Sequence, residues 1–409
     1  MPDSTGTYPF ESRSITRSRQ IYENMKSPAF LKYYFKNMTI SSIKNNEVYG
    51  NSPPDIFIGR FGYPNVSIGP LIPPRFGDTS ILGSPELWTG RSMEEIVSFR
   101  SALVRGMHRS RVTNADNGRI EEMIKELALA DTCSESSELL SRRPEPKVVL
   151  DENSQPYGPS APLKDMKIYS SKANPKIEKA YEDTSMSATD ALVELYGQGV
   201  MVSRIQKALA AGILGRGARR RFVPTRWSIT AVDDTLSKHN LKEVKQNEPT
   251  EEILVYENNA LDNRWEIVMF PGSWEYELVE AWYPNTTWNM ESRNIQIYSS
   301  YEPFSGRSKY AEIGGCYYAA RLASSELLKK MGRQAKVVIL REAHPGYIMP
   351  VGVWNVREHV REALRGTPLS FGNINDLFAH LRSKLDISVH DWMENSALLR
   401  NVTRQRRLA

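Results

Sequence analysis

The spacing of apolar and polar positions predicts short strands and then a run of amphipathic helices in the first part of the chain. Residues 51–90 combine apolar residues with many prolines and glycines, which is typical of short strands broken by tight turns. A helix should follow, because Ser92 and Glu95 have the spacing of a capping box and apolar residues then recur every three or four positions. We expect Gly106 to end this helix. The same periodicity predicts further helices from about residue 117, over 187–196 and over 202–212.

The pattern changes twice more toward the C-terminus. Three apolar runs separated by turn sequences predict a meander of strands over 253–256, 265–270 and 276–281. From residue 294 onward the periodicity predicts helix, strand, helix and helix instead. Their expected positions are 312–331, 336–340, 356–364 and 377–385. Because the order of elements is mixed, we expect an α+β fold with a mostly antiparallel sheet and a smaller C-terminal α/β region.

Shifts in composition divide the chain into three expected parts. Residues 1–50 mix basic and aromatic side chains and form an N-terminal segment. We place an N-terminal domain at 51–290 and a C-terminal domain at 291–409, which ends in a basic tail. Several prolines predict an extended connector over 141–165 within the first domain. A length of 409 residues fits two domains, or three at most, at roughly 100–200 residues each.

Composition and charge exclude several classes of protein. With 40% hydrophobic and 25% charged residues, the chain has ample material for a core, which excludes disorder over its bulk. Its two cysteines, Cys133 and Cys316, are too few for a disulfide framework or a cysteine-rich zinc ribbon. No apolar stretch is long enough to span a membrane, and the N-terminus has no secretory h-region. We therefore expect a soluble, cytoplasmic protein. Its net charge of +5 is too small to indicate a nucleic-acid partner by itself.

The most unusual segment is an acid-free basic stretch over residues 204–226. Its positive side chains occupy a predicted helix and the glycine-rich turn after it: Arg204, Lys207, Arg216, Arg219, Arg220, Arg221 and Arg226. Arginine offers a planar fork of donors for phosphate oxygens, and glycines let the backbone approach closely. This pattern predicts a surface that contacts the phosphate backbone of a nucleic acid. The alternative is a solvated basic loop, or arginines paired with acids elsewhere in the fold.

Two adjacent carboxylates, Asp233 and Asp234, follow this stretch at the end of a run that resembles a β-strand. Adjacent carboxylates can bind Mg²⁺ or Mn²⁺, which prefer oxygen ligands, and a nuclease or phosphodiesterase would need such acids near the arginines. Acids followed by Thr and Ser are also common at a helix N-terminus, where the helix dipole favours them. We favour this second interpretation, in which the pair caps a helix.

Glu342 and His344 are the remaining candidates for catalysis. They are expected just past the end of a strand, and positions two apart on a strand point the same way, so both would face one cleft. Such a pair permits general acid–base chemistry. The alternative is a structural histidine in a loop before Pro345. No histidines have the spacing of a metal-ligand pair, so the sequence predicts no metal site and requires no cofactor.

Four parts of the sequence together resemble the archaeal Nre family of DNA repair proteins. They are FIGRFGYPNVSIGP (57–70), RSALVRG (100–106), VPTRWSITAVDD (223–234) and a block from GGCYYAARLA (314–323) to VVILREAHPGYIMPVGVWNVRE (337–358). The resemblance runs from about residue 50 to 385 and spans the family's N-terminal and C-terminal regions. It implies a role in DNA repair, with DNA as a partner and repair proteins as further partners.

Two features of many family members are missing from this chain. Many begin with a four-cysteine, zinc-finger-like element, but no cysteine precedes Cys133 here, so that zinc site cannot form. Many end in a glutamine-based motif for the sliding clamp, and Gln405 lacks both its spacing and its aromatics. The resemblance therefore does not support clamp binding. The tail arginines offer a nonspecific nucleic-acid contact or simply a frayed end: Arg400, Arg404, Arg406 and Arg407.

The leading hypothesis is a DNA repair protein that binds DNA through arginine-rich loops. Trp227 would stack on an exposed base, and the expected phosphate contacts are Arg60, Arg216, Arg219, Arg220, Arg221 and Arg226. The first alternative is a hydrolase or phosphodiesterase that acts on modified or blocked nucleotides or nucleic-acid ends. It would use Glu342 and His344, or Asp233 and Asp234 with Mg²⁺ or Mn²⁺. The second alternative is a non-enzymatic adaptor in a repair complex, which predicts an exposed apolar patch.

Overall fold

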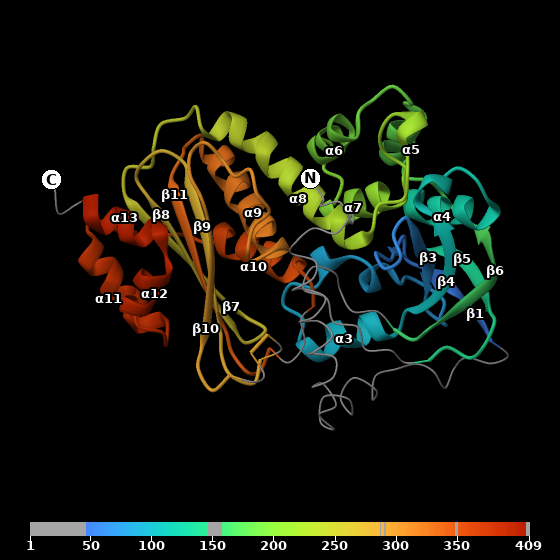
Figure 1. The fold of residues 1–409 in the computed structure, drawn as a ribbon, viewed down its shortest axis with the longest axis horizontal. Helices are drawn as coiled ribbons and strands as arrows, with labels where there is room; N and C mark the ends of the chain where they lie inside the picture. Colours follow the sequence, from blue (N-terminus) through green and yellow to red (C-terminus); the bar gives the residue numbers. More distant parts are fainter. Residues whose placement is uncertain (1–45, 146–157, 287, 290–291, 348–350, 406–409) are drawn as a thin grey trace.

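A computed structural model describes residues 46–145, 158–286, 288–289, 292–347 and 351–405. Nearly all of the predicted N-terminal segment (1–50) and the middle of the predicted connector (141–165) lie outside these ranges. Within them, the chain forms two six-stranded mixed sheets surrounded by helices (Figure 1), so the expected α+β class is confirmed. No helix in this part of the chain is long and apolar enough to cross a membrane.

The first sheet is built entirely from the N-terminal part of the chain. Its strands have the spatial order β1-β5-β6-β4-β3-β2. They are β1 (Glu47–Ser52), β2 (Ile56–Ile58), β3 (Asn65–Ile72), β4 (Val104–Arg111), β5 (Ser134–Leu140) and β6 (Ser160–Ser170). Neighbouring strands pair antiparallel except for β4 and β6, which are parallel.

Of the five helices in this part of the molecule, four follow the predicted periodicities and α5 (Pro175–Glu182) was not predicted. The capping box of Ser92 and Glu95 is present at the start of α3 (Met93–Ser101). The other predicted helices are α4 (Arg119–Leu129), α6 (Ala188–Gly197) and α7 (Val202–Ala210). Their apolar faces share one core with the first sheet, in which Ile124 of α4 and Ile205 of α7 are fully buried. Helices α4 and α7 thus cover one face of the first sheet (Figure 1).

The prediction that Gly106 ends a helix is wrong. Helix α3 ends at Ser101, and Gly106 lies inside β4 instead. The reason is a close approach between neighbouring strands, because a Cβ atom on Gly69 of β3 would collide with the carbonyl oxygen of Gly106. The glycines at these positions therefore serve strand packing rather than a helix terminus.

The second sheet has the order β10-β9-β11-β8-β7-β12. Its strands are β7 (Ile253–Ala260), β8 (Asn263–Phe270), β9 (Glu275–Trp282), β10 (Gln296–Glu302), β11 (Lys336–Ala343) and β12 (Leu369–Phe371). All pairs are antiparallel except β11 with β9, which is parallel. Residue 290, where we divided the sequence, lies between β9 and β10, which are neighbours in this sheet.

Helices cover both faces of the second sheet (Figure 1). One face packs on α8 (Thr225–Val244), α9 (Gly315–Met331) and α10 (Trp354–Arg365), and the other on α11 (Ile374–Lys384), α12 (Val389–Asn395) and α13 (Ala397–Gln405). Alternate residues of β11 fill the two cores: Val337 and Ile339 face α8–α10, whereas Val338 and Leu340 face α11–α13. This alternation decides which side chains can share a site.

The prediction that Asp233 and Asp234 end a β-like run and cap a helix is wrong. Helix α8 begins at Thr225, directly after Pro224, so both acids lie near its middle. The β-branched residues before them suggested a strand, but Ile229, Val232 and Leu236 are buried at helical spacing. Burial of this apolar face against both cores outweighs the weak helix propensity of the β-branched residues.

Candidate nucleic-acid interface

The glycine-rich turn between α7 and α8 carries most of the predicted phosphate-binding arginines. A short 3₁₀ helix, η5 (Gly217–Arg219), lies within it, and Arg216, Arg219 and Arg221 are exposed. Arg220 is held against the protein instead. It donates to the carbonyl oxygens of Gly215 at 2.8 Å and Asp183 at 3.2 Å, and its guanidinium lies over the ring of Tyr181. Arg220 therefore shapes the turn, and its three neighbours face solvent.

The first two basic residues of the stretch do not belong to this surface. Arg204 is buried and donates to the carbonyl oxygens of Pro54, Ala128 and Ala130. Burial lowers the pKa of Arg204 to about 10. Lys207 lies 3.3 Å from the carboxylate of Asp55 and also donates to the carbonyl oxygen of Gly83. Arg204 and Lys207 thus lie on the inward face of α7, apart from the basic residues of the turn that follows.

Arg226 and Trp227 lie in the first turn of α8, next to the loop that contains Arg60. The amide of Ile58 donates to Oγ1 of Thr225 at 2.9 Å, which joins β2 to the start of α8. The rings of Tyr63 and Trp227 lie 5.2 Å apart, and the guanidinium of Arg60 lies over Phe61. Phe61 is 64% exposed and Tyr63 is 49% exposed. The fold therefore brings Arg60 and Arg226, 166 positions apart in the sequence, to one place with exposed aromatic rings.

Four residues of this surface were missed by the sequence analysis: Phe61, Tyr63, Arg109 and Arg111. Arg109 and Arg111 are exposed on β4, opposite Ser67 and Asn65 of β3. The amide of Phe222 donates to the carbonyl oxygen of Val112, which joins the arginine turn to the end of β4. We call the whole set the cation–aromatic surface. It comprises Arg60, Phe61, Tyr63, Arg109, Arg111, Arg216, Arg219, Arg221, Arg226 and Trp227.

Four arginines of this surface are not neutralised by acids among the described residues. Arg109, Arg111, Arg219 and Arg221 form no ion pair with any acid in the part of the chain that the structure describes. Exposed guanidinium groups without acidic partners favour phosphate oxygens, and exposed rings favour the flat faces of unpaired bases. Period-two placement of arginines in RSR (109–111) was the sequence signal that could have revealed the strand residues.

Asp233 and Asp234 lie in ion pairs between helices. Nη1 of Arg357 on α10 contacts both carboxylate oxygens of Asp233, and Gln206 on α7 donates to the same group at 3.2 Å. Burial raises the pKa of Asp233 to about 6, against the opposing effect of Arg357. Asp234 pairs with Arg321 on α9 and with Lys238. Both carboxylates have partners in place, and this geometry joins helices rather than presenting an open metal site.

Glu342 and His344 do lie together, as the sequence predicts. Nε2 of His344 is 3.2 Å from Oε2 of Glu342, and the imidazole stacks on Tyr283 at 4.3 Å. Glu342 is fully buried and also accepts hydrogen bonds from the amides of Asp386 at 3.2 Å and Ile387 at 2.8 Å. It thereby anchors the segment that leads into α12. This anchor lies on the α11–α13 face, so the fold does not combine it with Asp233 and Asp234.

Among the residues that the structure describes, two groups have ligand atoms close enough to share a metal ion: Glu342 with His344 and Asp386, and Glu257 with Glu266 and His380. In the first group, Asp386 also pairs with Arg264 at 2.6 Å. In the second group, Glu257 pairs with Lys384 at 2.9 Å. In each group, one carboxylate therefore already has a basic side chain as its partner.

Comparison with known proteins assigns the family. The model for the N-terminal region of archaeal Nre matches residues 24–289, and the model for the C-terminal region matches residues 302–409. The chain belongs to the archaeal Nre family. No solved structure matches it.

Two curated relatives show how far the similarity extends. The chain is 40% identical over 363 residues to DNA repair protein NreB of Archaeoglobus fulgidus, covering 88% of this chain and 91% of the relative. It is 32% identical over 375 residues to DNA repair protein NreA of Haloferax volcanii, covering 89% of each. The similarity therefore includes both sheets, and the cation–aromatic surface falls within the matched N-terminal region.

Proposed function

We propose that this protein acts in DNA repair and holds DNA on the cation–aromatic surface. The repair role is supported by the relatives, which are named DNA repair proteins and match nearly the whole chain. The mode of binding rests on one observation. Exposed arginines from β4 and from the α7–α8 turn, which have no acidic partner among the described residues, lie beside the exposed rings of Phe61 and Tyr63.

This combination of groups suits single-stranded or locally opened DNA. Arginines contact the phosphates of either form and release condensed counterions, so affinity falls as salt rises. Aromatic rings add stacking only where bases are unpaired. The protein should therefore bind a single strand, or a duplex with an unpaired region, more tightly than a fully paired duplex of equal length.

The test is a titration of fluorescently labelled single strands and duplexes with the full-length protein at several salt concentrations. Substitution of Arg219 and Arg221 by alanine should weaken binding. It should also flatten the duplex salt slope by about 0.9 for each phosphate contact removed. The matched control replaces Arg365 and Arg382, two exposed arginines of the second half, and removes the same charge. Equal loss in both double variants would show that only net charge matters and would contradict the assigned surface.

The hydrolase alternative is supported only by the contact between Glu342 and His344. The amides of Asp386 and Ile387 already occupy the carboxylate of Glu342, which leaves it little freedom to move a proton. Mg²⁺ or Mn²⁺ would enter this scheme through the group that Glu342 forms with His344 and Asp386. Release of labelled products from DNA ends in the presence of either metal, and its loss in His344→Ala, would favour the hydrolase over simple binding.

A further inference from the structure

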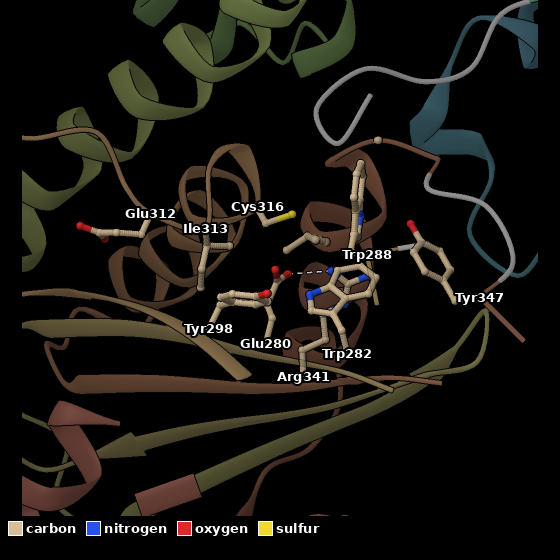
Figure 2. A pocket seen from close by; sticks show the side chains of 11 residues that line it. Glu280, Trp282, Trp288, Tyr298, Glu312, Ile313, Cys316, Arg341 and Tyr347 are labelled. Carbon is tan, nitrogen blue, oxygen red and sulfur yellow. Dashed lines mark hydrogen bonds and ion pairs between the residues drawn. The ribbon is translucent and has the colours of Figure 1, made fainter. Parts of the chain in front are cut away.

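A cavity lies where the second sheet meets α9 and α10 (Figure 2). The empty space of about 600 Å³ includes the open mouth, so it is an upper bound on the enclosed volume. This size admits one small planar molecule and excludes a duplex. Four of its eleven lining residues are aromatic side chains from different parts of the chain: Trp282, Trp288, Tyr298 and Tyr347.

The floor of the cavity is a buried ion pair between Glu280 and Arg341. Nη1 of Arg341 donates to Oε1 of Glu280 at 2.7 Å, and Nε donates to Asn263 at 2.9 Å. The guanidinium also lies over the rings of Trp265 and Trp282, at 4.7 and 4.8 Å from their centroids. Arg341 is thus fixed by its surroundings and in turn positions the carboxylate of Glu280.

One oxygen of this carboxylate remains available to a ligand. Glu280 is only 4% exposed, and it points into the cavity in Figure 2. Its Oε1 binds Arg341, while Oε2 accepts no hydrogen bond from the described residues. A buried acceptor that faces a cavity without a donor is costly unless water or a ligand supplies one. We therefore expect a ligand at this site to donate a hydrogen bond from an N–H or O–H group to Oε2 of Glu280.

The charge and shape of the cavity narrow the class of ligand. Arg341 balances the charge of Glu280, so the site does not require a cationic ligand. Aromatic rings beside Oε2 of Glu280 favour a neutral, planar molecule whose edge donates hydrogen bonds, because Glu312, the other acid of the lining, is held by Arg307 and Ser300. A nucleobase with an exocyclic amino group is neutral and planar, and its edge donates hydrogen bonds. A glutamate that accepts from such a group is an established mode of base recognition.

We propose that this cavity receives a single amino-bearing nucleobase from DNA bound at the cation–aromatic surface. The presentation by DNA rests on the proposed function. Contacts of Asp234 with Arg321, Asn240 with Ser325 and Glu243 with Lys329 show that α8 and α9 run parallel. Trp227 and Cys316 therefore lie in the first turns of two parallel helices, one at the surface and one at the cavity wall.

The test places one 2-aminopurine, a fluorescent base with an exocyclic amino group, in a single strand. The strand is bound to full-length protein, and quenching by acrylamide reports whether that base is enclosed. We expect at least roughly fivefold protection in the wild type and its loss in Tyr298→Ala and Glu280→Gln. Tyr298 is partly exposed, so Tyr298→Ala keeps the test valid if the buried Glu280→Gln variant does not fold. Phe304→Ala, an exposed aromatic outside the cavity, is the matched control and should retain protection.

Strand affinity, measured on the same samples, separates this proposal from the proposed function. Loss of protection in Tyr298→Ala with strand affinity retained supports the cavity. Equal quenching in wild type and Tyr298→Ala, while Arg219→Ala/Arg221→Ala still weakens DNA binding, overturns the cavity and leaves the surface intact. A further arm offers free 2-aminopurine nucleoside. If Tyr298→Ala abolishes protection of the nucleoside and the wild type never protects the base in DNA, presentation by DNA is overturned.

Discussion

Asp233 on α8 and Arg357 on α10 form a fully buried ion pair in which one guanidinium nitrogen contacts both carboxylate oxygens, at 2.9 and 2.8 Å. Gln206 on α7 donates to the same carboxylate. The pair therefore connects the helices of the first core with those that cover the second sheet. An acid that the sequence suggested for metal binding or helix capping instead joins the two halves of the molecule.

Substitution of Asp233 by asparagine should lower the free energy of unfolding by about 3 kcal/mol, because it leaves the buried charge of Arg357 without its main partner. Chemical denaturation measures this change. Asp234→Asn is the matched control. It should lower the free energy of unfolding much less, because Arg321 retains its ion pair with Glu302 at 2.5 Å. If Asp233→Asn folds with normal stability but abolishes an activity on DNA, the structural role would be refuted.

His359 should give the fold a measurable dependence on pH. Burial lowers its pKa to about 4, so the folded state keeps the imidazole neutral where the unfolded chain, with a pKa near 6.5, binds a proton. Stability from this group is complete above pH 6.5. It falls by up to about 1.4 kcal/mol per pH unit between 6.5 and 4. Denaturation of His359→Gln over this range should show a flatter profile than wild type, and parallel profiles would contradict the assignment.

Trp227→Ala should weaken binding of single-stranded DNA by about 1–3 kcal/mol and change duplex binding much less, because only unpaired bases can stack on the ring. Fluorescence titrations of both forms measure the difference. Tyr310→Ala removes another exposed aromatic, one that packs on Tyr318 away from this surface, and should change neither affinity. An equal loss for single strands and duplexes would argue against stacking.

Glu342→Gln should destabilise the protein by about 1–3 kcal/mol, because its buried carboxylate accepts the amides of Asp386 and Ile387. Hydrogen exchange should become faster around the start of α12. His344→Ala should destabilise the protein less, because the imidazole is partly exposed and contacts only one oxygen of the Glu342 carboxylate. A loss of catalysis in both variants with unchanged exchange would instead indicate an acid–base pair.

The sequence predicts the local structure well where side-chain spacing alone decides it. The capping box of α3, the strands β7–β9 and the helices α9–α11 are confirmed, because each needs only one buried face and a suitable terminus. Helix α8 was mistaken for a strand, because its β-branched residues are typical of strands and its helical state depends on two cores on either side. The short elements β10, α12 and α13 were not predicted at all.

The candidate surface was predicted only in part. The arginines of the α7–α8 turn and Trp227 are exposed or half-buried, as a binding surface requires, but Arg204 and Lys207 face inward. Arg109 and Arg111 join the surface through the register of β4 with β3, which a single sequence does not reveal. The cavity was missed for the same reason, since Glu280 and Arg341 come from parallel strands 61 positions apart.

Strand β11 lies between β8 and β9, although it follows both of them in the chain by more than fifty residues. Once β7, β8 and β9 have been synthesised, β11 is still missing from its position between β8 and β9. One edge of each of these two strands is therefore unpaired at that stage. The strands of the first sheet are complete once β6 has been made, and most of the helices that cover it follow directly. We expect synthesis to pass through a stage in which the first sheet has formed while β8 and β9 keep unpaired edges until residues 336–343 are available.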